Sequence, residues 1–190
     1  MSFLDVFPNA VRNLLVAKIN EKDNSAVIVI LMGPAGSGKT TVGKLLAAEL
    51  SWEFADADDF HSAANKEKMS RGIPLTDEDR IPWLRSIREA ILQWQAQGKN
   101  AVIACSALKR SYRDLLGIHP NSKNIKLVYL KGSYDLLLER LHSRTGHYMK
   151  EQMLTSQLAD LEEPTDAIAV DISKSPNEIV SEIRKQLEFT

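Results

Sequence analysis

The sequence lacks several features that mark whole classes of protein. It has a single cysteine, Cys105, among 190 residues, which excludes an internal disulfide framework and fits a reducing compartment. No apolar run approaches the roughly 20 residues that a transmembrane helix needs. The formal net charge is only −1, so no charge excess indicates a surface for nucleic acid or membranes. No set of Cys and His residues has the spacing of a zinc site.

The first residues also lack the pattern of a secretory signal. Asp5 and Pro8 stand where such a signal has a basic end and an unbroken apolar stretch, so we expect a cytosolic protein. Hydrophobic residues make up 44% of the chain and charged residues 26%, which is typical of one globular domain. We assign that domain to residues 26–190. Residues 1–25 are predicted to be a helical extension, because four apolar residues recur there at helical spacing: Val11, Leu14, Leu15 and Ile19.

Short apolar runs alternate with helical patterns along the rest of the chain. Residues 26–32, "AVIVILM", are continuous and rich in β-branched side chains, as in a strand buried on both faces. Similar runs occupy residues 52–55, 100–107, 125–132 and 167–173. Helix starts are indicated by Pro82 in a first turn, by Ser133 as a cap, and by Ser175 with Glu178 as a capping box. Alternating strands and helices predict an α/β fold with a doubly wound parallel sheet.

A glycine-rich stretch links the first predicted strand to a helix. Residues 33–40, "GPAGSGKT", match the pattern G-x-x-x-x-G-K-[ST] in full. Glycines let backbone N–H groups surround phosphate oxygens, and the following helix adds the positive end of its dipole. Lys39 is predicted to bind the β- and γ-phosphates, and Thr40 to bind Mg²⁺. A glycine-rich turn without a ligand is the alternative. The predicted nucleotide site comprises Gly33, Pro34, Ala35, Gly36, Ser37, Gly38, Lys39, Thr40 and Thr41.

Acidic residues follow the second predicted strand, in "FADADDFH" at residues 54–61. Ligands of parallel α/β sheets bind beyond the carboxyl ends of the strands. Asp56 is therefore a candidate metal ligand, and Asp58 a candidate base for the proton of an acceptor hydroxyl. Alternation places both on one side if the chain stays extended. The alternative is a solvated acidic turn, in which Asp59 in particular caps the next helix.

The same region resembles a known enzyme family. Residues 56–84, "DADDFHSAANKEKMSRGIPLTDEDRIPWL", are similar to the signature region of the gluconate kinases, as are "CSALKRSYRDLL" at 105–116 and "RTGHYMKEQMLTSQLADLEEP" at 144–164. The resemblance covers roughly residues 27–187. It departs from the family where Ala57 replaces the usual glycine and where Phe60-His61-Ser62 replaces Leu-His-Pro. These departures affect the shape of the sugar-acid loop more than the reaction.

The resemblance implies a P-loop kinase of the adenylate and shikimate kinase type, with a short helical lid. It also implies that ATP phosphorylates D-gluconate at its 6-hydroxyl, with Mg²⁺ as cofactor, and that the protein is a homodimer. Gluconate carries a carboxylate and a row of hydroxyls, so its pocket needs cations at one end and hydrogen-bonding groups along the rest. Asp58 and His61 are candidates for the hydroxyls. The candidate cations, each of which could instead form a surface ion pair, are Arg71, Arg80, Lys109 and Arg110.

The predicted lid spans about residues 141–151. Arg140 and Arg144 are four positions apart, hence on one face of a helix, and could bring positive charge to the transferring phosphoryl group. Gly146 offers a hinge, and His147 is a further candidate substrate contact. The alternative is an exposed basic helix end stabilised by its dipole.

Other functions share part of this pattern. A shikimate-type or nucleoside-monophosphate-type kinase would have the same phosphate loop and lid but a different acceptor pocket. A nucleotide-binding switch would need no acceptor pocket, and so no acidic cluster beside "CSALKR". The release of ADP with a panel of acceptors distinguishes these alternatives.

Overall fold

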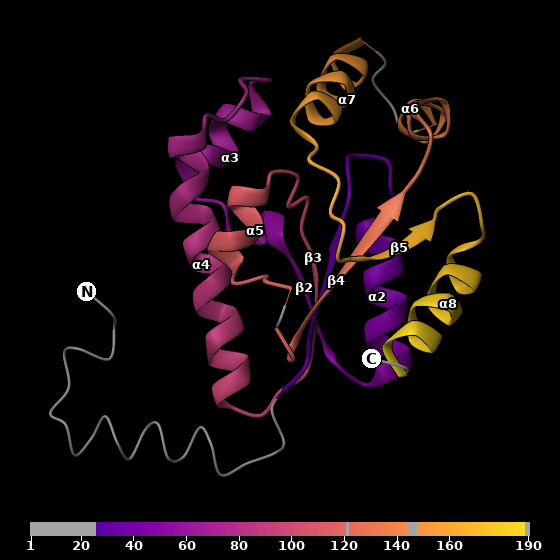
Figure 1. Ribbon diagram of the computed structural model, residues 1–190. Coiled ribbons are helices and arrows are strands. Elements are labelled where there is room, and N and C mark those ends of the chain that lie inside the picture. The colour runs from indigo at the N-terminus through magenta and orange to yellow at the C-terminus, as the bar shows by residue number, and fades with distance from the viewer. Residues whose placement is uncertain (1–25, 121, 144–147, 189–190) are drawn as a thin grey trace, which may run out of the picture.

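The structure, a computed structural model, describes residues 26–120, 122–143 and 148–188 (Figure 1). The helix predicted over residues 1–25 lies outside them. Five parallel strands form one sheet in the order β2-β3-β1-β4-β5, which confirms the predicted parallel sheet. Each strand coincides with a predicted run, with ends that differ by a few residues. The strands are β1 (Ile28–Met32), β2 (Glu53–Asp56), β3 (Ala101–Ala104), β4 (Ile125–Lys131) and β5 (Ile168–Asp171).

Helices cover both faces of the sheet, as expected for a doubly wound fold (Figure 1). One face carries α2 (Lys39–Leu50) and α8 (Pro176–Glu188), and the other carries α4 (Asp77–Ala96) and α5 (Arg110–Leu116). A short 3₁₀ helix, η2 (Ala57–Phe60), and α3 (Ala63–Ser70) lead into α4. Beyond the carboxyl ends of the strands lie α6 (Tyr134–His142) and α7 (Tyr148–Asp160).

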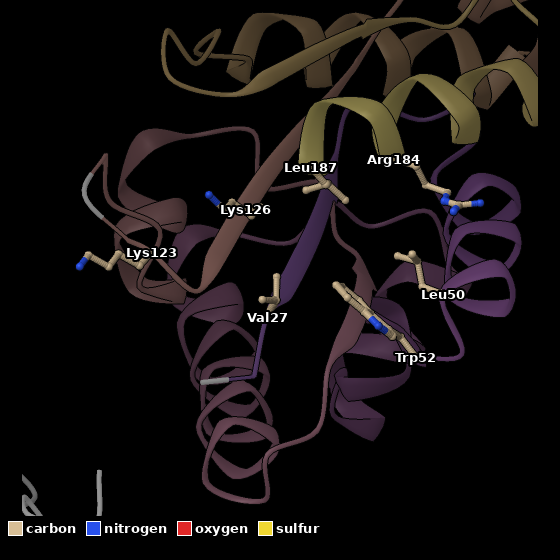
Figure 2. A pocket seen from close by; sticks show the side chains of 7 residues that line it. All are labelled: Val27, Leu50, Trp52, Lys123, Lys126, Arg184 and Leu187. Carbon is tan, nitrogen blue, oxygen red and sulfur yellow. The ribbon is translucent and has the colours of Figure 1, made fainter. Parts of the chain in front are cut away.

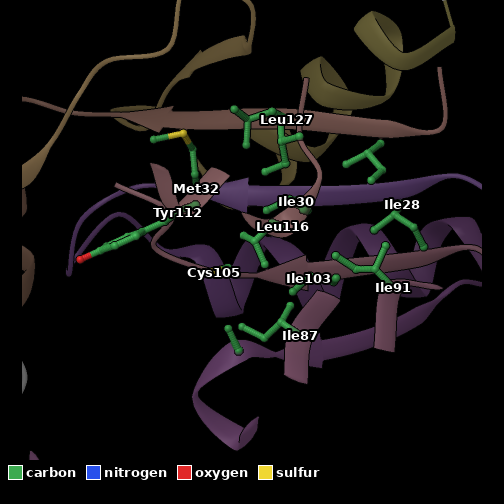
Figure 3. Close-up of a cluster of buried hydrophobic side chains, with 14 of the residues drawn as sticks. Ile28, Ile30, Met32, Ile87, Ile91, Ile103, Cys105, Tyr112, Leu116 and Leu127 are labelled. Carbon is green, nitrogen blue, oxygen red and sulfur yellow. The ribbon is translucent and has the colours of Figure 1, made fainter. Parts of the chain in front are cut away.

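The central strand β1 supplies both halves of the core. Successive side chains of a strand point to opposite faces, so Ile28, Ile30 and Met32 pack toward α4 and α5, whereas Val29 and Leu31 pack toward α2 and α8. All five side chains are fully buried. Figure 3 shows the first cluster, in which Ile87 and Ile91 of α4 meet the strand residues. Burying an aliphatic side chain of this size stabilises the fold by about 1.5–3 kcal/mol, which holds the carboxyl edge of the sheet in place.

Capping explains where the helices begin. Ser133 accepts a hydrogen bond from Leu136 N–H at the start of α6, and Ser175 exchanges hydrogen bonds with Glu178 at the start of α8, as the sequence predicts. The helix start assigned to Pro82 is wrong. Here α4 begins at Asp77, because Thr76 and Asp79 form a capping box and the acidic first turn complements the helix dipole. Pro82 then lies inside the helix.

The fold brings the ends of three strands together. The glycine-rich loop follows β1, Asp56 ends β2, and Ser106 follows β3. Gly33 N–H donates to the Ser106 carbonyl at 3.3 Å, which joins the loop to the segment after β3. Within the described part of the chain, no helix is both long and apolar enough to cross a membrane.

Candidate active site

At two points the glycine-rich loop adopts a backbone conformation that strongly favours glycine. Gly36 and Gly38 have φ values of +84° and +89°, in the region that side chains disfavour. A Cβ atom on Gly36 would lie 2.8 Å from the Leu137 carbonyl oxygen of α6, so that close approach also requires glycine. Gly38 precedes the first residue of α2. The loop N–H groups therefore meet the positive end of a 12-residue helix, an arrangement that suits a phosphate group.

Two side chains at the start of α2 add an ammonium group and a hydroxyl group beside this loop. Lys39 Nζ donates to the carbonyl oxygens of Gly33 and Pro34, each at 2.9 Å, so the ammonium group lies over the loop. Thr40 Oγ1 donates to Asp56 Oδ2 at 2.8 Å. This hydroxyl and carboxylate are hard oxygen donors of the kind that Mg²⁺ prefers. The residues present thus fit a triphosphate with its magnesium ion.

The acidic segment after β2 forms a turn rather than an extended chain. Asp56 Oδ1 accepts a hydrogen bond from Asp58 N–H at 3.2 Å and caps η2. The condition of an extended chain, under which alternation would align Asp56 and Asp58, is therefore not met. Asp59 is not the cap of the next helix either, because Ser62 fills that position through a bond from Asn65 N–H. Asp58 is still close enough to Asp56 and Lys39 for their charges to affect its pKa, which Asp56 raises and Lys39 lowers.

His61 is held against α4 by an aromatic stack. Its ring lies 4.4 Å from the Trp83 ring at an interplanar angle of 11°. Trp83 Nε1 donates to the Ala57 carbonyl at 2.6 Å, which fixes η2 on the same helix. His61 is only 8% exposed, and its Nδ1 has no hydrogen-bond partner among the described residues. A buried polar atom without a partner is costly, so Nδ1 has the capacity for a ligand hydroxyl.

Burial shifts the pKa values of these two residues in opposite directions. Partial burial raises the pKa of Asp58, and the neighbouring Asp56 carboxylate raises it further, against the opposing charges of His61 and Lys39. The Asp58 side chain still reaches solvent. Burial lowers the pKa of His61, and the charges of Lys66 and Arg80 lower it further, against Asp58. The shifts favour a carboxylate with raised basicity beside a neutral imidazole.

Four charged residues and a tyrosine gather near the start of α4. Lys109 Nζ donates to Asp77 Oδ1 and Oδ2 at 3.0 and 3.1 Å. Arg80 Nη1 donates to the Tyr112 hydroxyl at 2.9 Å, and that hydroxyl donates to Asp77. Asp160 of α7 lies 3.8 Å from Arg80 and 3.7 Å from Lys109. We call these five residues the acceptor cluster; they come from α4, α5 with its preceding residue, and α7.

A buried arginine donates hydrogen bonds to the backbone of the loop that carries Lys109. Arg113 is 7% exposed, and its Nη1 donates to the carbonyls of Ala107 and Leu108 at 3.0 and 2.8 Å. Ala107 has a φ of +45°, which is strained for a residue with a side chain. A backbone held in this way fixes the direction in which Lys109 leaves the loop.

The structure brings together only some of the predicted cations. Arg80 and Lys109 are in the acceptor cluster. Arg71 ends α3 with 68% of its side chain exposed and pairs with Glu67 at 3.8 Å. Arg110 is exposed at the start of α5, where its N–H donates to Glu162. The roles predicted for Arg71 and Arg110 gain no support from this placement and stay predictions.

The lid residues are described only in part. Arg140 Nη2 donates to the Ile172 carbonyl at 2.6 Å, and a Cβ atom on Gly38 would lie 3.9 Å from Arg140 Nη1. Arg140 is thus beside the phosphate loop. Arg144, Gly146 and His147 lie outside the described residues, and α6 ends at His142. The shared helix face predicted for Arg140 and Arg144 therefore stays a prediction.

Several residues that reach the site were not predicted from the sequence as site residues. Asp77 and Tyr112 lie within the motifs "GIPLTDEDR" and "CSALKRSYRDLL", so the family resemblance contained a signal for them. Asp160 and Gln157 of α7 lie within the third stretch of the resemblance, residues 144–164, which did not indicate what they contact. Gln157 Oε1 accepts a hydrogen bond from Ala35 N–H at 2.6 Å. It reaches the phosphate loop over 122 residues of sequence, a contact that only the fold reveals.

A cavity of about 370 Å³ lies at the opposite edge of the sheet (Figure 2). Val27 precedes β1 and Lys126 lies near the start of β4, so this cavity is separated from the phosphate loop by the length of the strands. Four of its lining residues are apolar and three are basic. The cavity is therefore distinct from the candidate active site. Its lining residues are Val27, Leu50, Trp52, Lys123, Lys126, Arg184 and Leu187.

Known proteins resemble this chain along most of its length. A family model described as shikimate kinase matches residues 35–188. A probable gluconokinase of Xenopus tropicalis is 44% identical over 178 residues, which cover 85% of this chain and 94% of that protein. The thermoresistant gluconokinase of Escherichia coli (strain K12) is 42% identical over 158 residues, with 81% and 89% covered. The crystal structure of a gluconokinase from Sinorhizobium meliloti 1021 has a TM-score of 0.72 at 40% identity and covers 88% of this chain and 98% of that chain.

Proposed function

Because the chain belongs to the gluconokinase family, we propose that it transfers the γ-phosphoryl group of ATP to the 6-hydroxyl of D-gluconate. The products would be 6-phospho-D-gluconate and ADP. The observation that carries the proposal is the position of Asp58. Asp58 lies in η2 between Asp56, which accepts the hydrogen bond from Thr40 beside the phosphate loop, and His61, which stacks on Trp83 of α4. A base in that place can serve a hydroxyl lined up with a bound triphosphate.

The nucleotide half of the proposal rests on the phosphate loop. Residues 33–41 would bind ATP, with backbone N–H groups around the β- and γ-phosphates and Lys39 as the mobile cation. Thr40 and Asp56 would hold Mg²⁺, Asp56 through water. Bound there, Mg²⁺ would neutralise phosphate charge and orient the triphosphate. The Thr40–Asp56 hydrogen bond at 2.8 Å supports their joint assignment.

The chemical step follows from the residues around Asp58. Asp58 would accept the proton of the 6-hydroxyl as that oxygen forms its bond to the γ-phosphorus and the bond to the leaving ADP oxygen breaks. Lys39 and Arg140 would stabilise the negative charge on the transferring group, and we place Arg144 with them. His61, neutral and stacked on Trp83, would bind a second hydroxyl through Nδ1. A lid over residues 141–151 would exclude water from the site.

The acceptor cluster is where the carboxylate of gluconate would bind. Lys109 and Arg80 are paired with Asp77 and Asp160, and charge-assisted hydrogen bonds of this kind also suit a substrate carboxylate. Arg71, Arg110 and His147 remain candidate contacts. We also propose that the protein is a homodimer in the cytosol. Each chain would consist of an N-terminal extension over residues 1–25 and a kinase domain over residues 26–190. The family resemblance supports the dimer, and the single buried thiol, Cys105, fits a reducing compartment.

The proposed function is tested by ADP release with a panel of acceptors. We expect strong turnover with D-gluconate and little with shikimate or nucleoside monophosphates. Turnover with shikimate would favour the shikimate-type alternative. Hydrolysis of ATP that no acceptor changes would favour a nucleotide-binding switch and would contradict the proposal.

The assignment of Lys109 makes a separate prediction. Lys109→Met keeps much of the side-chain length and removes the charge, so we expect the KM for D-gluconate to rise about tenfold or more, with the KM for ATP nearly unchanged. Steady-state kinetics with each substrate varied in turn measure both values. Lys99→Met is the matched control, because Lys99 is half exposed and pairs only weakly with Glu53 at 4.0 Å. An unchanged KM for D-gluconate would remove Lys109 from the carboxylate site.

A further inference from the structure

Helix α7 contacts both halves of the candidate site. Gln157 Oε1 accepts the hydrogen bond from Ala35 N–H at 2.6 Å, and Asp160 is the member of the acceptor cluster that pairs with Arg80 and Lys109. Residues three positions apart lie on neighbouring parts of one helix surface. Leu154, one turn before Gln157, is fully buried in the core. The helix is therefore anchored where it touches the phosphate loop.

The Ala35 amide lies in the part of the loop where the backbone contacts neighbouring segments. It lies between Gly33, whose N–H is bound by Ser106, and Gly36, whose Cα lies against the backbone of α6. Ala35 is half-buried, so its N–H loses part of its hydration and needs a partner. The partner is a neutral side-chain amide on α7, which satisfies Ala35 without placing negative charge beside a phosphate site.

We propose that Gln157 is a positioning residue that holds the phosphate loop in the conformation required to bind nucleotide. The proposal rests on the assignment of residues 33–41 as the ATP site. A loop that lacks this hydrogen bond populates the binding-competent conformation less, and the apparent nucleotide affinity falls by the same fraction. Losing one hydrogen bond of ordinary strength corresponds to about a three- to tenfold change.

The test is Gln157→Met in the full chain, since methionine keeps the length of the side chain without its acceptor. We expect the Kd for ADP, measured by calorimetry without any acceptor, to rise about three- to tenfold. The KM for ATP should rise with it, and the KM for D-gluconate should stay the same. Amide exchange followed by NMR should show faster exchange at Ala35. Gln152→Met is the matched control, because Gln152 is exposed on the same helix; it should leave all four values unchanged.

A conservative variant separates positioning from general stability. Gln157→Glu retains an acceptor oxygen, so the exchange of the Ala35 amide in the nucleotide-free protein should return to the wild-type rate. The proposal is overturned if Gln157→Met binds ADP like the wild type, or if Gln157→Glu exchanges at Ala35 as fast as Gln157→Met. Because ADP binding is measured without an acceptor, these outcomes are independent of whether D-gluconate is the substrate. A wild-type protein that binds ADP but phosphorylates no acceptor would contradict only the proposed function.

Discussion

Replacing Asp58 with asparagine is expected to reduce kcat by about 10²- to 10⁴-fold, the usual contribution of a positioned general base. The KM for ATP should change little, because Asp58 is assigned to the acceptor hydroxyl and not to the phosphates. Steady-state kinetics and direct nucleotide binding measure the two effects separately. If ATP affinity collapsed while D-gluconate affinity held, Asp58 would belong to the nucleotide site and the assignment would be wrong.

The raised pKa of Asp58 predicts that the same variant is not less stable. The folded protein holds the Asp58 proton more tightly than the unfolded chain, in which the pKa is near its ordinary value of 3.8. Ionised Asp58 therefore destabilises the fold, and this cost appears as the pH rises through the raised pKa and is absent below the ordinary one. At pH 7, Asp58→Asn should unfold at the wild-type temperature or above it.

The matched control for this variant is Asp59→Asn. Asp59 is exposed, and the contact that it makes with Lys66 goes through its backbone carbonyl, so kcat should stay near the wild-type value. The acid limb of the wild-type pH profile should also lie above the ordinary pKa of an aspartate, because Asp58 must be deprotonated to accept a proton. A variant with both a lower kcat and a lower unfolding temperature would indicate a structural role instead.

Replacing Lys39 with alanine is expected to lower kcat/KM for ATP by about 10²- to 10³-fold, the range seen when one preorganised charge-stabilising donor is removed. The ammonium group lies over the loop through its bonds to Gly33 and Pro34, where phosphate charge would be. Kinetics with ATP varied measure the loss. The fold should remain, because Lys39 is only partly buried and is not part of either hydrophobic cluster.

Lys44→Ala is the control for this prediction. Lys44 is on the same helix, is exposed, and lies 5.9 Å from the Phe54 ring, so its removal tests the loss of a nearby positive charge alone. We expect kcat/KM for ATP to stay close to the wild-type value. An unchanged rate in Lys39→Ala would contradict the role assigned to Lys39 and, with it, the assignment of the phosphate loop.

The sheet and the phosphate loop follow closely from the sequence. Continuous β-branched runs such as residues 26–32 are typical of strands buried on both faces of a covered parallel sheet, and the structure has that sheet. The cap at Ser133 was predictable because it is a local contact: the side chain of a capping residue bonds to the backbone N–H three positions further on. Pro82 misled the prediction because a stronger start signal, Thr76 with Asp79, lay one turn and a half earlier.

The acceptor side was predictable only as a set of candidates. Four cations fitted the chemistry of a carboxylate, yet only Arg80 and Lys109 meet around Asp77. Their convergence depends on the placement of α4 beside α5, which no local pattern encodes. The stack of His61 on Trp83 has the same origin, because the start of α4 decides which residues of that helix face η2.

By itself, the sequence determined that this chain has a phosphate loop between a buried strand and a helix, because those residues are neighbours in the chain and local backbone chemistry acts between neighbours. Only the tertiary structure decided which charges surround the acceptor and that Gln157 supports Ala35. Those contacts join residues 32 to 122 positions apart, and their geometry is set by how the helices pack on the sheet.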